Sequence, residues 1–200
     1  MKIMNKDYLI QQLSDLAAKY DIAAGRELLG ELVAMSSFKV IPKGSVIASI
    51  GDDTRYSGLM INGTARSYYI DNEGDDITRS FAVEGSLFMD EGLYGYNERF
   101  CMWEVLEDST VMICETSKVR ELIRDNNAFK DLWIILLEQA VRYKLYRENG
   151  FLVENATERY IHFRKIFPNL ASRISQKHIA TYLGITPESL SRIRSSLKDL

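Results

Sequence analysis

Residues 175–200 read SQKHIATYLGITPESLSRIRSSLKDL, and the spacing of their apolar side chains predicts two short helices. Ile179, Tyr182 and Leu183 stand at i, i+3 and i+4, which gives residues 176–183 one apolar stripe of helical period. A helix of this kind buries its stripe against other helices. The segment should therefore belong to a small helical domain.

A turn and a second helix follow directly. Gly184 ends the first helix, and Thr186 offers a side-chain oxygen as N-cap. Pro187 stands at the first helical position, where its missing N–H costs nothing, and the helix should run to about Leu197. Two helices joined by a glycine-containing turn form a helix-turn-helix.

The two faces of the second helix differ in chemistry. Apolar side chains cluster on one face, and polar ones cluster on the other: Glu188, Ser191, Arg192 and Ser195. When such a helix reads DNA in the major groove, Arg pairs with guanine and Glu accepts from cytosine N4. Glu188 and Arg192 have these chemistries. The alternative is a surface ion pair on an ordinary helical hairpin, since i,i+4 pairs are common and contribute only about 0.3 to 0.5 kcal/mol.

The distribution of charge favours DNA. The chain has 25 Lys and Arg against 28 Asp and Glu. From Ala156 onward eight basic residues face three acidic ones, giving +5, while the remaining 17 basic and 25 acidic residues give −8. Phosphate contacts need local rather than global positive charge. A merely solvated basic face is the alternative.

Length and composition predict two domains, because 200 residues with 46% hydrophobic content can bury one full core and a smaller satellite core. The N-terminus lacks the pattern of a signal peptide, and no apolar run approaches 18 residues, so we expect a cytoplasmic protein without a membrane partner. Cys101 and Cys114 have no metal-ligand spacing. We expect both to be small core residues.

Residues up to about 38 show helical periodicity and predict one or two covering helices. From Lys39 to about Cys114, short β-branched and aromatic runs alternate with Gly and Asp/Asn clusters. Regular short strands with these turn signals indicate an antiparallel sandwich or barrel.

A long helix from Asn127 to about Asn149 carries two apolar stripes and therefore needs two partners. One stripe can cover the barrel, and the other can pair with a second chain as a coiled coil. Burial of both stripes within a monomer is the alternative. We predict these dimer-interface residues: Phe129, Trp133, Leu136, Leu137, Ala140 and Tyr143. Residues 150–154 then form a hinge, and Asn155 with Glu158 starts the next helix through a capping box.

This order of parts resembles the Crp/Fnr family of bacterial transcription regulators, related to the cyclic-AMP receptor protein, over about residues 25–200. Barrel stretches such as IPKGSVIASIGD and VLEDSTVMIC carry the resemblance, as do ATERYIHFRKIFP and ISQKHIATYLGITPESLSRIRSSL. Glu188, Ser191 and Arg192 reproduce the E-x-x-S-R pattern with which Fnr-like members read DNA, which implies base contacts. The expected DNA-binding set is completed by Ser189, Arg194, Thr186, Gln176 and Lys177.

The resemblance implies an α+β protein in three parts. Residues 1–126 would hold the N-terminal helices and a cyclic-nucleotide-binding-like antiparallel β-barrel of the double-stranded β-helix or jelly-roll type. Residues 127–154 would be the dimerisation helix and hinge, and residues 155–200 a helix-turn-helix domain with a reduced or absent wing. The implied partners are a second copy, a near-palindromic double-stranded DNA operator, RNA polymerase and a small effector.

Departures from the family bear on the effector. Cyclic-AMP receptors hold the nucleotide with a Gly-Glu and a later Arg-Ser, and only Gly85 and Arg99 survive here. We therefore expect an effector other than cyclic AMP, a small anion held by Arg99. The rest of its pocket would come from Gly85, Phe88, Met89, Tyr94, Tyr96 and Phe100. The alternatives are a structural ion pair of Arg99 with Glu98 or Asp90, and a core role for the large side chains.

No cofactor is expected. Two cysteines cannot hold an iron-sulfur cluster that needs four thiolates, and a haem ligand is not expected because His162 and His178 both lie in the DNA-binding segment. Catalysis is not expected either, because the barrel has no histidine for a metal and the chain has no Gly-x-Ser-x-Gly elbow or Walker loop. A metabolite-sensing module that acts through protein contacts remains the alternative function.

Overall fold

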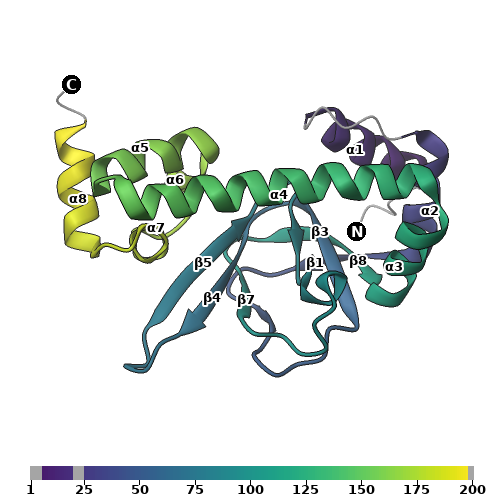
Figure 1. Cartoon of the computed structure of the whole chain (residues 1–200), viewed down its shortest axis with the longest axis horizontal. Coiled ribbons are helices and arrows are strands. Elements are labelled where there is room, and N and C mark those ends of the chain that lie inside the picture. Colours follow the sequence, from purple (N-terminus) through teal and green to yellow (C-terminus); the bar gives the residue numbers. More distant parts are fainter. Residues whose placement is uncertain (1–5, 20–24, 198–200) are drawn as a thin grey trace. The chain divides into compact units, whose positions relative to one another are not determined.

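The computed structural model describes residues 6–19 and 25–197. Its eight strands form two four-stranded sheets, ordered β1-β8-β3-β6 and β2-β7-β4-β5 (Figure 1). The strands are β1 (Ser36–Ile41), β2 (Val46–Ala48), β3 (Tyr56–Asn62), β4 (Ala65–Ile70), β5 (Asp76–Ala82), β6 (Leu87–Phe88), β7 (Met102–Val105) and β8 (Ser109–Glu115). The helices are α1 (Lys6–Lys19), α2 (Arg26–Met35), the 3-10 helix η1 (Glu91–Tyr94), α3 (Thr116–Asp125), α4 (Asn127–Val153), α5 (Ala156–Ile166), α6 (Leu170–Arg173), α7 (Gln176–Leu183) and α8 (Pro187–Ser196).

The predicted α+β class is confirmed, and of the two predicted arrangements of the strands, an antiparallel sandwich or a barrel, the structure has the sandwich. Strand β8 pairs antiparallel with both β1 and β3, and β2 pairs antiparallel with β7 in the other sheet. The edge strands of the first sheet, β1 and β6, have no ladder to the edge strands of the second, β2 and β5, in the sheet order. The strands therefore form an open sandwich, in which side chains rather than backbone hydrogen bonds join the sheets.

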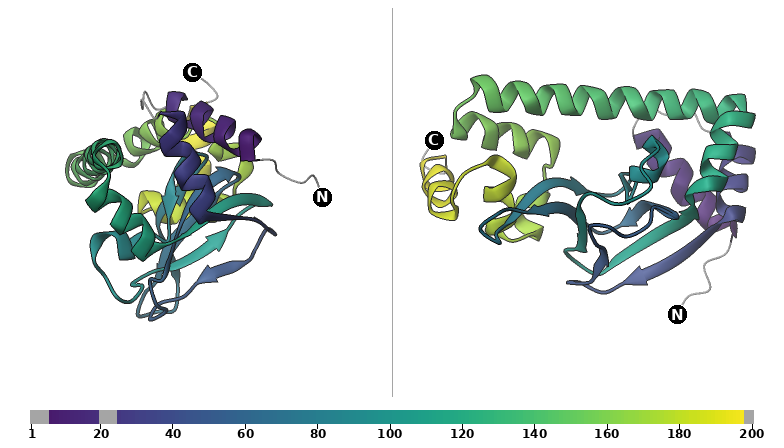
Figure 2. Two further views of the ribbon diagram at one scale, coloured as in Figure 1. Left: turned by 90° about the vertical axis from the view of Figure 1, so that its right-hand side faces the viewer. Right: turned by 60° about the horizontal axis from the view of Figure 1, so that its bottom comes forward.

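The first sheet is buried on both faces. Met60 and Val111 point to the core between the sheets, whereas their neighbours Ile61 and Met112 point to a second core beneath helices α1, α2 and α3. Such burial on both sides explains the nearly continuous apolar sequence of β8. Helices α1 and α2 pack on each other over this second core (Figure 2).

Contacts divide the chain into two compact units. The first unit holds residues 1–66 and 81–138, and the second holds residues 67–80 and 139–200. Helix α4 contributes to both units. The hairpin of β4 and β5 thus belongs with the C-terminal helices, which the pattern of the sequence did not indicate.

The local signals for the C-terminal helices are confirmed. Gly184 ends α7 in the left-handed conformation at φ 67°, and the side chain of Thr186 accepts from the backbone N–H of Ser189 at 3.2 Å. Asn155 and Glu158 form the predicted capping box at the start of α5. Helix α4 ends later than the expected position at about Asn149, because it continues to Val153 and the Glu154 N–H still bonds the Gly150 carbonyl at 3.1 Å. The hinge over residues 150–154 stays a prediction.

Candidate functional sites

The outer face of α8 presents the predicted polar residues to solvent. Glu188, Ser191 and Arg192 are exposed, and Leu190 on the opposite face is fully buried. Thr186, Gln176 and Lys177 are also exposed, while Ser189 and Arg194 are partly buried. The structure thus brings the three central residues to one accessible surface.

The carboxyl group of Glu188 is held in its charged form. Its own backbone N–H and the Thr186 hydroxyl lower the pKa of Glu188 below its ordinary value, and the charge of Arg192 acts in the same direction. An ionised carboxylate can only accept hydrogen bonds. Glu188 therefore has the chemistry to meet an amino group such as cytosine N4.

An aromatic core supports α7 and α8 from behind. The ring of Phe163 on α5 lies 5.5 Å from that of Phe167 and 5.6 Å from that of Tyr182, centroid to centroid. Ser175 caps α7 by accepting from the Lys177 N–H at 3.2 Å. These contacts hold α7, and α8 packs against both α7 and α5, so that the exposed side chains on α8 have a rigid base.

The hairpin of β4 and β5 contacts α7 within the second unit. The hydroxyl of Thr181 donates to the Thr78 hydroxyl at 2.9 Å and accepts from the Thr78 N–H at 3.3 Å. Lys177 Nζ lies 3.3 Å from Asp76 Oδ1. The sequence assigned Lys177 to DNA, and the structure gives it an acidic neighbour that no local pattern indicated.

Two residues of α4 fasten that helix to α7. The hydroxyls of Tyr143 and Tyr182 are 2.7 Å apart. Arg147 lies over the Tyr182 ring, 4.3 Å from its centroid, and donates to the carbonyls of Tyr182 and Arg79. Burial raises the pKa of both phenols, so both stay neutral at ordinary pH. The sequence analysis missed Arg147, whose only signal was its spacing of four residues from Tyr143.

Arg99 forms a buried ion pair. Its Nη1 donates to Glu91 Oε2 at 2.8 Å and its Nη2 donates to the Tyr56 carbonyl at 2.7 Å. The two partners named from the sequence, Glu98 and Asp90, were wrong, because η1 carries Glu91 into the interior. An anion at Arg99 would have to displace the Glu91 carboxylate.

The other residues predicted for the effector do not line one common pocket. Phe88 is fully buried against Trp103, with the ring centroids 6.0 Å apart, and Met89 is buried in the same core. Tyr94 and Tyr96 are instead 43% and 55% exposed. Phe100 packs edge-on against the Tyr96 ring, centroids 5.0 Å apart. Gly85 forms a turn at φ 87°.

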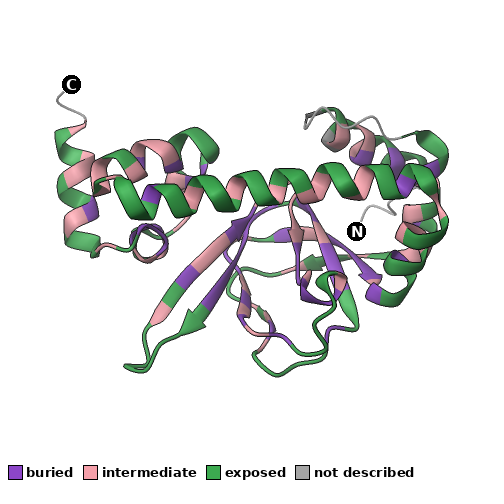
Figure 3. Ribbon diagram, in the orientation of Figure 1, coloured by how far each residue is buried: buried purple, intermediate pink, exposed green. Residues whose placement is uncertain are grey.

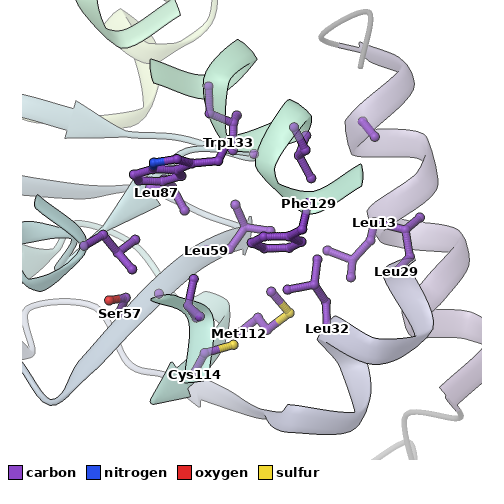
Figure 4. Close-up of a pocket in the computed structure, with 17 residues that line it drawn as sticks. Leu13, Leu29, Leu32, Ser57, Leu59, Leu87, Met112, Cys114, Phe129 and Trp133 are labelled. Carbon is purple, nitrogen blue, oxygen red and sulfur yellow. The ribbon is translucent and has the colours of Figure 1, made fainter. Parts of the chain in front are cut away.

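A separate apolar pocket of about 130 Å³ lies on the helix-covered side of the first sheet (Figure 4). Of the predicted effector residues it includes only Gly85. Its wall is almost entirely apolar and comes from α1, α2, β3, β6, η1, β8, α3 and α4, with Gly85 from the loop before β6. The side chains labelled around it include Leu13, Leu29, Leu32, Leu59, Leu87, Met112, Cys114, Phe129 and Trp133.

Five of the six residues predicted for the dimer lie on one apolar stripe of α4, and Leu137 lies on the other. Phe129, Trp133 and Leu136 line the pocket in their own unit, and Tyr143 bonds Tyr182. Leu137 and Ala140 are partly buried. The other stripe stays accessible along the helix (Figure 3), with Ile134, Val141 and Leu145 at 48%, 52% and 59% exposure. The two stripes have the same period, so only packing decides which of them faces its own unit, and the predicted interface stays a prediction.

In the described ranges, 6–19 and 25–197, no helix is long and apolar enough to cross a membrane. The same residues contain no group of three or more His, Cys, Asp or Glu that could hold a metal ion. The prediction of a reduced or absent wing concerns residues after α8, of which the structure describes only Leu197; the basic Lys198 lies outside the described residues.

Comparisons with known proteins identify the fold. Neither a family model nor a curated protein matches the chain. Among solved structures, FixK2 from Bradyrhizobium japonicum is similar with 22% identity and a TM-score of 0.72, covering 82% of this chain and 85% of that one. The catabolite activator protein of Thermus thermophilus is similar with 19% identity and a TM-score of 0.57, over 90% and 86% of the two chains.

A protein from Eubacterium rectale assigned to the Crp/Fnr transcriptional regulators has 16% identity and a TM-score of 0.65, over 84% of this chain and 82% of its own. At these identities the likeness concerns the fold alone. The fold of this chain is that of the Crp/Fnr regulators.

Proposed function

We propose that this protein is a DNA-binding transcription regulator of the Crp/Fnr type. The observation that carries the proposal is the accessible row of Glu188, Ser191 and Arg192 on α8, backed by the buried Leu190. The α7–α8 segment is then a helix-turn-helix whose second helix enters the major groove. The basic charge of residues from 156 onward supports phosphate contacts. The likeness to solved regulators supports the same class.

We also propose that the protein acts as a homodimer through α4. Ile134, Val141 and Leu145 lie along one face of a 27-residue helix, and such an exposed stripe suits a parallel two-helix seam. Two copies would place two α8 helices on half-sites about 34 Å apart on a near-palindromic operator. Leu145→Lys should shift the protein to monomer in sedimentation. Lys144→Ala, an exposed change on the same helix, should leave the dimer intact.

The DNA proposal is tested by selecting binding duplexes from a random pool and measuring affinity for the best one. Arg192→Ala should weaken binding by about 1 to 3 kcal/mol and relax the preference at one base position. Arg120→Ala removes the same charge from an exposed position on α3 and serves as the control. Equal losses for the two variants would contradict base reading by Arg192.

Salt dependence separates this proposal from a module that acts through protein contacts. A DNA-binding dimer should lose affinity steeply as salt rises, because bound phosphates release counterions. A flat dependence, or no selected duplex at all, would favour the protein-contact alternative.

A further inference from the structure

The apolar pocket of the first unit has its polar groups already paired within the chain. Ser57 Oγ lies 2.7 Å from Thr116 Oγ1, and Cys114 Sγ lies 2.8 Å from Ser36 Oγ. Burial raises the pKa of the Cys114 thiol, so that this group stays neutral. A charged or strongly polar ligand would lose its hydration here and gain no partner. The lining therefore excludes the anion predicted from the sequence and selects an uncharged apolar molecule.

The volume of the pocket limits the size of the ligand. Its volume is about 130 Å³. Apolar cavities of roughly 150 Å³ lined by Leu, Ile and Phe stay dry and take up benzene or xenon, whereas pockets for drug-sized ligands span about 300 to 1,000 Å³. A single six-membered ring fits this volume.

The pocket wall differs from the surface offered to a second copy of the chain. Phe129 and Trp133 on α4 face the pocket, whereas Ile134 and Val141 on the same helix are about half exposed. A partner chain bound to the exposed stripe would not contact the inward-facing side chains of α4, which would stay packed within the first unit. Side chains from α2 and the first sheet also line the pocket: Leu29, Leu32, Leu59 and Met112 (Figure 4).

We propose that this pocket binds a small uncharged molecule the size of one aromatic ring, with Phe129 and Trp133 as its contacts on α4. A ligand bound there contacts the first sheet, the N-terminal helices and α4 at the same time. Its role as an effector rests on the proposed DNA-binding function, because α4 also carries Tyr143, which bonds α7. The binding itself does not depend on that function.

Fluorobenzene is a suitable first probe, and its binding to the unmodified protein can be monitored by fluorine NMR. We expect its line to broaden on addition of protein and to sharpen again when benzene competes. Anthracene, which is too large for the pocket, should not compete. An unchanged fluorobenzene line, or equal competition by anthracene, would overturn the proposal.

Matched variants locate the site. Leu59→Phe fills the pocket from β3, and Leu122→Phe makes the same change on α3 at a partly buried position outside the lining. Benzene should raise the melting temperature of the natural protein and of Leu122→Phe, and the rise should be absent from Leu59→Phe. Equal rises in all three would place the benzene elsewhere. If Leu59→Phe does not fold, Leu132→Phe on α4 replaces it.

The selected DNA duplex separates binding from regulation. Benzene should change the affinity for that duplex at concentrations that fill the pocket. Benzene binding with unchanged DNA affinity would keep the ligand site and overturn its role as an effector pocket. Failure of all DNA binding would remove the effector role but would leave the benzene result standing.

Discussion

Loss of the Glu91 carboxylate should destabilise the first unit more than any change to a surface ion pair. Glu91 is 1% exposed and accepts from Arg99 Nη1 at 2.8 Å, from Cys101 Sγ at 3.1 Å and from Trp103 Nε1 at 3.2 Å. Glu91→Leu would leave the guanidinium, which is 4% exposed, without its counter-charge. Removing one partner of a buried ion pair lowers the free energy of unfolding by about 3 to 5 kcal/mol. Such a loss is a large share of the free energy of unfolding of an ordinary domain, which is roughly 5 to 15 kcal/mol.

Urea unfolding followed by tryptophan fluorescence measures this effect, because Trp103 and Trp133 both lie in the first unit. The control is Asp7→Asn, whose ion pair with Arg26 has side chains 73% and 66% exposed. That change should cost less than about 1 kcal/mol.

The double variant Glu91→Leu with Arg99→Met should recover most of the lost stability, because it removes both charges and keeps the volume. A loss below about 1 kcal/mol for Glu91→Leu alone would refute the reasoning. A double variant as unstable as the sum of its single changes would refute it as well, since the pair would then carry no coupling.

Three further outcomes follow from the second unit. Asp76→Asn removes the negative charge near Lys177 Nζ and should tighten DNA binding by up to about fivefold in an anisotropy titration, since a surface ion pair is worth about 0.2 to 1 kcal/mol. Gly184→Ala forces a Cβ into left-handed backbone and should destabilise the helices by about 1 kcal/mol, measured by thermal unfolding. Burial raises the pKa of Tyr143 and Tyr182. Because the unfolded chain then loses the phenol protons at lower pH than the folded one, the free energy of unfolding should fall as pH rises above about 10. In melting curves recorded at a series of pH values, Tyr182→Phe should make this fall less steep.

Sequence patterns located helices well where the signal is local. The ends of α7, the cap at Thr186 and the capping box at Asn155 depend on neighbouring residues only, and all three were predicted from spacing and residue type. The accessible face of α8 was likewise predicted from the helical period of its apolar and polar side chains. The end of α4 was misplaced because a Gly inside a helix weakens it without ending it.

Contacts between distant residues could not be predicted in the same way. The acid that pairs with Arg99 was sought among near neighbours in the chain, and nothing in the sequence distinguished Glu91 from Glu98 or Asp90. The Thr78 contact with Thr181 joins residues 103 positions apart. Side chains of this kind become partners only when the strands and helices are already packed.

The sequence by itself determined the kinds of segment, their order and the chemistry offered by α8, because backbone propensity and helical period act over a few residues. Tertiary structure alone decided which stripe of α4 faces inward, which acid neutralises Arg99 and where the apolar pocket lies. These features arise from packing between elements, where several side chains of equal hydrophobicity compete for one surface and only the shape of the assembled unit selects among them.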